Sequence, residues 1–355
     1  MADEPRPVVG ATIVVVLVLS PLVSLFGPRV VTTVPGDVTR GYRAVYLIDD
    51  RAGDRPSVRT EVVGVHRPYG GRIENRPGRP PGGEVSSGRV SNREFGWQLD
   101  DGGALQFGFR RPSGGPTRDV SYAAMRDAAD AGVVVQGGAG SALGRRCTWF
   151  FFRDPFPEPL APPTDDDRIE ACVDPAGVLL REAWIIDGKV QRITETVALE
   201  TTAPGPDAFL EGRVPDPTDV TQPEALEIVG KQVFVGDDVD EKRTELDLAQ
   251  PSGWRRDRNA RVVQAGATGR ATQFASLAYV RGNELVIVEI GMQADHEPTW
   301  LWNEGESIEI PDASKARVLY FGDHVEVRVG YDDGFARINA PTRAIAVAFA
   351  TRAAG

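Results

Sequence analysis

The run from Val8 to Phe26 carries no charged side chain and precedes a long, mostly polar chain rich in Pro and Gly. At about 1.5 Å rise per residue, a helix of this length spans a hydrocarbon layer of about 30 Å, whereas the apolar core of a secretory signal is usually only about 7–15 residues long. Pro21 interrupts the run and leaves a cleaved signal open, but no small-x-small cleavage site follows it. The sequence therefore predicts an uncleaved transmembrane signal anchor over residues 8–27, after a cytoplasmic stub of residues 1–7.

The chain has two cysteines, Cys147 and Cys172, separated by a loop-like stretch of Pro and Asp. Two independent buried thiols are one reading, and a disulfide is the favoured one. A disulfide persists only in an oxidising compartment, and closing this loop adds about 3 kcal/mol. Pairing would place the chain after Gly27 outside the cytoplasm, which predicts a single-pass protein of the cell membrane with its bulk extracytoplasmic. The spacings of redox and zinc motifs are absent.

The formal net charge is −11. Binding to phosphate backbones requires a basic face, so this charge argues against a nucleic-acid partner. The length beyond the anchor suits one large or two modest domains, with enough apolar residues for real cores.

Apolar residues after Gly41 follow a period of two, which predicts strands. These strands do not alternate with long helices, which argues against a doubly wound parallel sheet. The Cys147–Phe152 segment places apolar side chains on both faces of a predicted strand, as in a strand that other structure covers on two sides. The other predictions for this part are strands at 42–48, 58–65, 168–173, 178–186 and 189–199, a hairpin over 94–109, a short helix over 122–131 and a Gly-rich connector over 137–144.

The stretch from Thr201 to Pro223 is dense in Pro, Asp and Thr, which is linker composition. Beyond it the sequence predicts strands at 284–290, 307–310, 316–321 and 324–329, with Gly322-Asp323 as a hairpin turn. Pro341 suits the first position of a terminal helix that carries an apolar stripe. The predicted class is therefore α+β and β-rich: a curved antiparallel sheet domain over 38–202, a linker over 203–225 and a small α+β domain with a C-terminal helix over 226–355.

The block from Ile169 to Ala183, followed by Ile186–Val190 and Glu195–Val197, resembles the "vDp.tGLplr…dG.v…t.v" meander of the LolA-like superfamily. That superfamily includes lipoprotein carriers, lipid-binding lipoproteins and the MucB/RseB-type regulators of envelope-stress sigma factors. The resemblance is centred on Cys147 to Leu199. It implies a half-barrel sheet wrapped partly around helices, with an apolar concavity for an acyl chain or a lipidated peptide, and the two-domain layout is closer to the MucB/RseB branch.

Local signatures of catalysis or metal binding are not found in the sequence. His66, His296 and His324 lie far apart and lack metal-ligand spacing, and the Gly138–Gly144 segment matches neither a phosphate loop nor a nucleophile elbow. The acidic clusters do not follow the calcium-loop pattern. We therefore expect a non-enzyme with no cofactor and no metal site.

Six aromatic residues of the first domain are the candidates for a ligand cavity wall, with ordinary core as the alternative for each. The leading hypothesis is a membrane-anchored extracytoplasmic protein that binds a lipid, a lipoprotein or an envelope-protein segment. The alternative is a regulatory or scaffolding subunit that docks a membrane-bound partner such as an anti-sigma factor or a secretion component. The cavity candidates are Trp97, Phe107, Phe109, Trp149, Phe151 and Trp184.

Overall fold

The computed structural model of the chain describes residues 40–52, 56–93, 95–110, 119–153, 159–212, 232–235, 251–265, 271–292, 304–331 and 334–353. The predicted anchor and most of the predicted linker lie outside these residues. Among the helices of the described part, none has the length and apolar character needed to cross a membrane.

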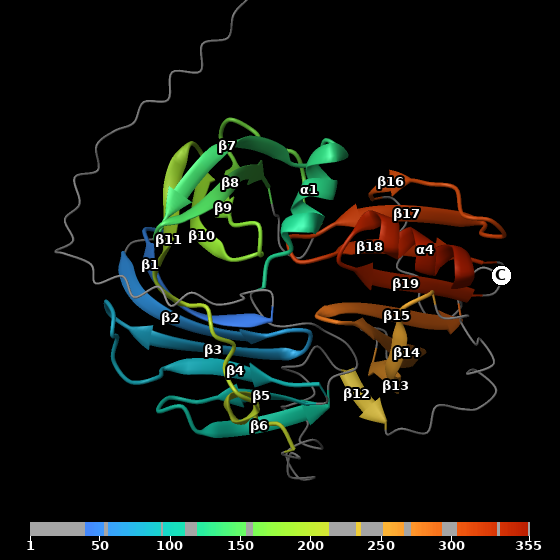
Figure 1. Cartoon of the computed structure of the whole chain (residues 1–355), viewed down its shortest axis with the longest axis horizontal. Helices are drawn as coiled ribbons and strands as arrows, with labels where there is room; N and C mark the ends of the chain where they lie inside the picture. The colour runs from blue at the N-terminus through green and yellow to red at the C-terminus, as the bar shows by residue number, and fades with distance from the viewer. Residues whose placement is uncertain are drawn as a thin grey trace, which may run out of the picture. The chain divides into compact units, whose positions relative to one another are not determined.

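The described chain is β-rich, with two antiparallel sheets and few helices (Figure 1). The first sheet has the order β6-β5-β4-β3-β2-β1-β11-β10-β9-β8-β7, so two meanders join where β1 pairs with β11. Its strands are β1 Gly41–Asp50, β2 Ser57–His66, β3 Gly70–Pro77, β4 Ser87–Ser91, β5 Phe95–Leu99, β6 Leu105–Arg110, β7 Val135–Ala142, β8 Arg145–Phe152, β9 Arg168–Val173, β10 Leu179–Ile186 and β11 Lys189–Glu200. This confirms the predicted antiparallel arrangement.

Helix α1 (Tyr122–Asp130) connects the two meanders and confirms the predicted short helix. Ser121 caps it, since its hydroxyl oxygen accepts a hydrogen bond from the Ala124 backbone N–H at 3.1 Å. Ala124, Met125 and Ala128 are buried and belong to the main hydrophobic core. The helix therefore fills part of one face of the first sheet.

The predicted Gly-rich connector is wrong, because its residues form most of β7 and pair with β8. Gly content weakens a strand assignment from sequence, since glycine has no side chain to pack. Here Gly140 is needed for close approach: a Cβ on it would lie 2.7 Å from Trp149 Nε1 and 2.9 Å from Cys172 Sγ. The small residues of β7 thus make room for the ring and the disulfide of neighbouring strands.

Strand β8 is apolar on both faces, as predicted. Successive side chains of a strand point to opposite faces. Phe150 is fully buried and contacts Tyr122 of α1 edge to face at 5.8 Å, and Thr148 bonds to the Tyr122 hydroxyl at 3.0 Å. We call this side the helix face. Trp149 and Phe151 lie on the opposite side, which we call the outer face.

The second sheet has the order β12-β13-β14-β15-β19-β18-β17-β16 (Figure 1). The predicted strands at 284–290, 316–321 and 324–329 are confirmed, whereas of the strand predicted at 307–310 only Ser307 lies in a strand. The Phe321 N–H donates to the His324 carbonyl at 2.9 Å across the predicted Gly322-Asp323 turn. The strands are β12 Gln232–Val235, β13 Arg255–Ala265, β14 Ala271–Arg281, β15 Glu284–Met292, β16 Glu306–Ser307, β17 Lys315–Tyr320, β18 Val325–Gly330 and β19 Gly334–Ala340.

The terminal helix α4 (Arg343–Ala353) packs on β18 and β19, as predicted. Pro341 precedes the helix and does not occupy its first position. The Thr342 hydroxyl accepts from the Ile345 N–H at 3.3 Å, so Thr342 acts as the cap. Phe349 anchors the helix, with ring centroids 5.4 Å from Trp254 and 5.1 Å from Tyr279.

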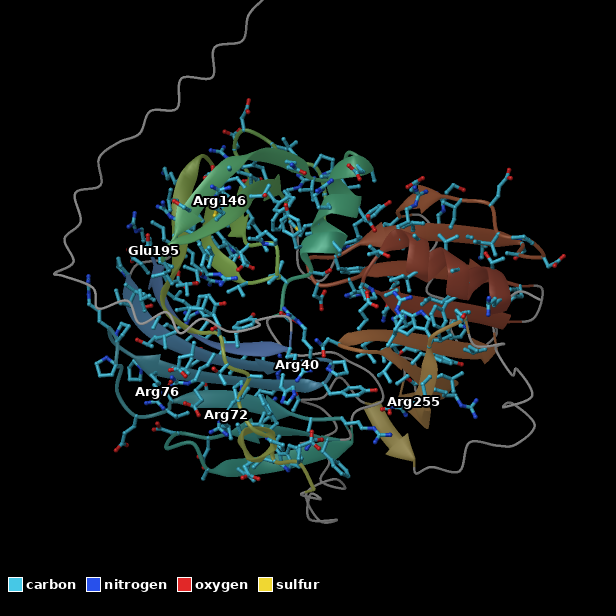
Figure 2. All side chains as sticks on the ribbon, viewed as in Figure 1. Arg40, Arg72, Arg76, Arg146, Glu195 and Arg255 are labelled. Carbon is cyan, nitrogen blue, oxygen red and sulfur yellow. A yellow bond between two sulfur atoms is a disulfide. The ribbon has the colours of Figure 1, made fainter. Side chains whose placement is uncertain are left out.

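A short 3-10 helix, η1 (Pro206–Phe209), packs on the first sheet. Phe209 is 1% exposed, and the Asn92 side-chain amide donates to its carbonyl at 3.1 Å. Arg72 and Arg76 both project from β3 (Figure 2) and hold the Glu74 carboxylate between them at 2.6 and 2.7 Å. Arg72 also donates to the Ala208 carbonyl at 3.3 Å, which ties η1 to β3.

Both sheets belong to one compact unit and are joined by polar contacts. The Ser121 N–H donates to the Gly322 carbonyl at 3.0 Å, and the Leu160 N–H donates to the Tyr320 carbonyl at 2.9 Å. The register of β13 shifts next to Asp257, a bulge that lets this carboxylate accept from the Tyr69 hydroxyl at 2.8 Å. Loops of the first sheet therefore rest on turns of the second.

Candidate functional site

The two cysteines form a disulfide between β8 and β9. Their Cα atoms are 5.4 Å apart, and Cys147 and Cys172 are 3% and 2% exposed. Trp149 is the register partner of Cys172, so the bond runs diagonally across the outer face beside the Trp149 ring. This confirms the predicted pairing.

Replacing both cysteines by Ala is expected to lower the free energy of unfolding by about 3 kcal/mol, because the bond closes a loop with a sequence separation of 25. Denaturant unfolding of the oxidised wild type and the double variant measures the difference. Wild-type protein in strong reductant serves as the chemical control and should match the variant. A difference near zero would contradict a structural role for the bond.

The six aromatic candidates do not form one wall. Trp149 and Phe151 share the outer face, whereas Trp184 pairs with Ile169, itself the partner of Phe152, and so lies on the helix face. Trp97 lies in β5 and is 3% exposed beside Phe95. Phe107 and Phe109 are in β6, where only the backbone is described. Among the four candidates whose side chains the structure describes, it therefore brings together only Trp149 and Phe151.

Trp184 lies in a polar part of the helix face. The Arg192 guanidinium sits 4.8 Å from the centre of its ring and donates to Asp50 at 3.0 Å. Among the described residues, Trp184 Nε1 and Thr194 Oγ1 are buried without a hydrogen-bond partner. An acyl chain placed here would leave such groups unsatisfied, which is unfavourable.

A pocket of about 410 Å³ lies where loops of the first sheet meet turns of the second. We call it the junction pocket. The first sheet contributes its β2–β3 turn, the segment before α1 and the β9–β10 turn, and the second contributes the β14–β15 turn, the β17–β18 turn and the end of β19. Its lining residues are Arg67, Pro68, Asp119, Val120, Ser121, Tyr122, Ala123, Pro175, Ala176, Gly177, Asn283, Glu284, Leu285, Ile287, Asp323, His324, Asn339, Ala340 and Pro341.

A buried ion pair organises one side of the junction pocket. Arg67 Nε and Nη2 each donate to Asp119 at 2.7 Å, and Nη2 also donates to the Ala176 carbonyl at 2.9 Å. The side chains of Arg67 and Asp119 are 14% and 15% exposed. Gly177 has φ +85°, and a Cβ there would lie 2.2 Å from the Val120 carbonyl oxygen. Three loops are thus closely packed around one guanidinium.

The environment of this ion pair affects its titration. Burial is the largest influence on Asp119 and raises the pKa of its carboxyl above the usual value, although Arg67 acts in the opposite direction. Burial also raises the pKa of the Tyr42 hydroxyl, which donates to Asp119 at 3.5 Å. The pair is therefore a buried charge unit that depends on both partners.

The other side of the pocket carries Asp323 and His324. His324 Nδ1 lies 2.7 Å from Asp323 Oδ1, and the imidazole stacks on Phe321 with ring centroids 4.6 Å apart. Burial favours the neutral imidazole, but the charge and hydrogen bond of Asp323 outweigh it and raise the pKa of His324 above its usual value. For Asp323, burial acts to raise the pKa, but the charge and hydrogen bond of His324 outweigh it, so the pKa of Asp323 lies below its usual value.

The His324 shift gives the stability of the protein a pH dependence with a definite sign. A histidine with a raised folded-state pKa contributes stability that is complete below its unfolded pKa of about 6.5 and is lost as pH rises through the folded pKa. We expect His324→Gln to cost more stability at about pH 5.5 than at about pH 8.5. Urea unfolding of both proteins at the two pH values measures this. A pH-independent difference would show that the pair is not coupled to folding.

A second groove, of about 700 Å³, lies between α1, β16 and the start of α4. Two of its acidic groups are engaged: Asp127 accepts from the Arg343 backbone N–H at 2.5 Å, and Glu306 pairs with the Arg343 guanidinium at 2.6 Å. Within the described residues, no group of three or more His, Cys, Asp or Glu side chains is placed to hold a metal ion.

Sequence reasoning missed the junction pocket. Arg67 and Asp119 are 52 positions apart and belong to no motif, and the pocket gathers six separate loops. The compact Asp174–Gly177 turn was recognisable: Asp174 Oδ1 accepts from the Ala176 and Val178 N–H groups at 3.0 and 2.8 Å. That signal predicts the turn but not what faces it.

No family model matches the chain, and no curated protein matches it. Among solved structures the chain is similar to MucB in complex with MucA(peri), at 12% identity over 88% of this chain and 93% of that chain, with a TM-score of 0.28. MucB solved alone is 13% identical over 90% and 92%, also at 0.28. The Pseudomonas aeruginosa MucA/MucB complex gives 12% identity over 88% and 93%, at 0.29. The chain is thus similar to MucB structures across most of its length. The identity and the TM-score of these matches are too low to support an argument about function.

Proposed function

We propose that this protein is a membrane-anchored, extracytoplasmic, non-catalytic binding protein, built on a LolA-like half-barrel, that recognises a polypeptide segment of another envelope protein at the junction pocket. The pocket carries the proposal. Its volume of about 410 Å³ is within the usual range for ligand sites, about 300–1,000 Å³, and domain junctions are a common place for them. The disulfide supports an oxidising compartment.

The lining favours a polypeptide over an acyl chain. A hydrocarbon chain in the junction pocket would remove water from the exposed carboxylates of Asp323 and Glu284 and offer them no hydrogen bond in return, which is costly. The helix face offers no better lipid site in the described part, because large side chains of the protein fill it. Tyr42, Tyr46, Met125 and Phe150 are each no more than 1% exposed.

Site-specific photocrosslinking in the full chain tests the proposal. A photoreactive residue is placed at Pro175 or at Asn283, which line the pocket from the two sheets, and at Val190, which is 39% exposed and lies outside it. We expect one discrete protein adduct from both pocket positions and none from Val190. The sequence resemblance makes a membrane-bound regulator, such as an anti-sigma factor, the first candidate to look for among the adducts.

A lipid analysis separates the alternative. An organic extract of the purified protein is examined by mass spectrometry for lipid in stoichiometric amount, with Trp149→Ala as a comparison. We expect none above the detergent control. Stoichiometric lipid that is lost in the variant, together with absent pocket adducts, would replace this proposal with lipid carriage.

A further inference from the structure

The walls of the junction pocket are apolar on the side where β15 and β19 meet the segment before α1. Ile287 is 4% exposed and Ala340 is 1% exposed, and Val120 and Leu285 are half-buried beside them. Such a surface suits a chain of methylene groups. Long basic side chains bury an apolar stem of this kind and keep their charged end near water.

The charged groups of the pocket have an acidic excess. Arg67 is held by Asp119 in the buried pair, so these two cancel. Glu284 and Asp323 remain, and their side chains are 41% and 58% exposed. Glu284 pairs with Arg281 at 2.8 Å, but exposed pairs of this type contribute little, so the carboxylate can exchange partners. The rim of the pocket therefore favours a cation.

An unused hydrogen-bond acceptor provides independent support for this reading. Asn339 lines the pocket, and its Oδ1 is buried with no hydrogen-bond partner in the part of the chain that the structure describes. A buried acceptor without a donor is uncommon in folded proteins and calls for an explanation, such as a ligand group. An ammonium or guanidinium group supplies only donors.

On the basis of the proposed function, we infer that the junction pocket receives a lysine or arginine side chain of the bound polypeptide. The apolar walls hold its stem, Asp323 and Glu284 hold its charge, and Asn339 accepts one of its hydrogen bonds. This requirement for a basic residue is a rule for which segments the protein can bind.

His324 makes this recognition sensitive to pH. Protonation puts a positive charge 2.7 Å from Asp323 and reduces the acidic excess. The charged groups around the imidazole are Asp323 in its own turn, Glu326 on β18 and Arg337 on β19, with Asp119, Arg67 and Glu284 across the pocket. A lysine probe keeps its charge over the relevant range, because its own pKa is about 10.4. Affinity for it should therefore fall as the solution is acidified.

The test compares two small probes, N-acetyl-lysine N-methylamide and N-acetyl-norleucine N-methylamide, which share a stem and differ in charge. Saturation-transfer NMR with the full chain in mild detergent gives both affinities. We expect the lysine probe to bind about tenfold or more tighter. Asp323→Asn should abolish this preference. Asp312→Asn is the matched control, since Asp312 is an exposed turn acid outside the pocket at φ +59°, a conformation that Asn tolerates.

Each outcome decides the inference. The inference is supported if the preference for the lysine probe disappears in D323N and persists in D312N. The preference should also decline between about pH 8 and about pH 6 in the wild type but not in His324→Gln. Equal affinities, or a preference unchanged in D323N, overturn it. If neither probe binds, it is overturned as well. The crosslinks from Pro175 and Asn283 are read separately, so polypeptide recognition can stand when the basic-residue rule fails.

Discussion

Replacing Arg67 by Met is expected to lower the free energy of unfolding by about 3–5 kcal/mol, the usual cost of removing one partner of a buried ion pair. Asp119 would remain 15% exposed with its main donor gone, and its pKa is already raised by burial. The Ala176 carbonyl would also lose its 2.9 Å hydrogen bond. Denaturant unfolding of the variant at about pH 7 measures the effect, because Asp119 must be charged there for the full cost to appear.

Two further variants identify the cause. Arg67→Met combined with Asp119→Leu removes both charges and should recover most of the loss, since well-packed apolar residues often replace a buried pair at little cost. Arg43→Met is the matched control: its pair with Glu200 has a similar 2.8 Å distance but is 43% and 53% exposed, so it should cost less than about 1 kcal/mol. A double variant no better than the single one would show that Arg67 acts by packing and not through the buried charge.

The second large effect separates two neighbouring residues of β8. Phe150→Ala is expected to cost about 3–5 kcal/mol, because Phe150 is fully buried on the helix face against Tyr122. Phe151→Ala should cost clearly less, since Phe151 is only half-buried on the outer face. Thermal or denaturant unfolding of the two variants measures the contrast.

The paired design makes the result informative. Both substitutions remove the same atoms from adjacent positions of one strand, so only the face differs. Equal costs, or a larger cost for Phe151, would contradict the assignment of α1 to the side of Phe150. If Phe151→Ala instead abolished binding of a ligand while stability was kept, the outer face would become a recognition surface.

Much of this fold follows from local patterns. The two-sided apolar character of Cys147–Phe152, the turns Asp174–Gly177 and Gly322-Asp323 and the helix after Ser121 all act through nearby residues, and each was predictable. Strand β7 was not predictable, because a run of glycines is typical of a loop. The reason for Gly140 is the close approach of the Trp149 ring, which depends on the neighbouring strand. The sequence offered six aromatic residues as a cavity wall, with core packing as the alternative, but could not assign them to faces, since a face depends on register with distant strands.

The junction pocket lay beyond sequence reasoning for a different reason. No motif surrounds Asp119 in the sequence, and its role in the pocket depends on the guanidinium of Arg67, which comes from a different loop. The sequence predicted His324 as a surface or hairpin residue. Its place in a pocket follows only from the contact between the two sheets. Sites of this type arise from tertiary contacts between unrelated turns, so local motifs do not mark them.

Besides its local cap Thr342, the first turn of the last helix has a hydrogen-bond acceptor from the first half of the chain. The Arg343 N–H at the start of α4 donates to Asp127 of α1, 216 positions earlier, and an unsatisfied first turn weakens a helix by about 0.5–2 kcal/mol. During synthesis the final helix therefore gains this hydrogen bond only once α1 is in place. A second half transferred to another protein would lose this hydrogen bond, so we expect the two halves to be inherited together.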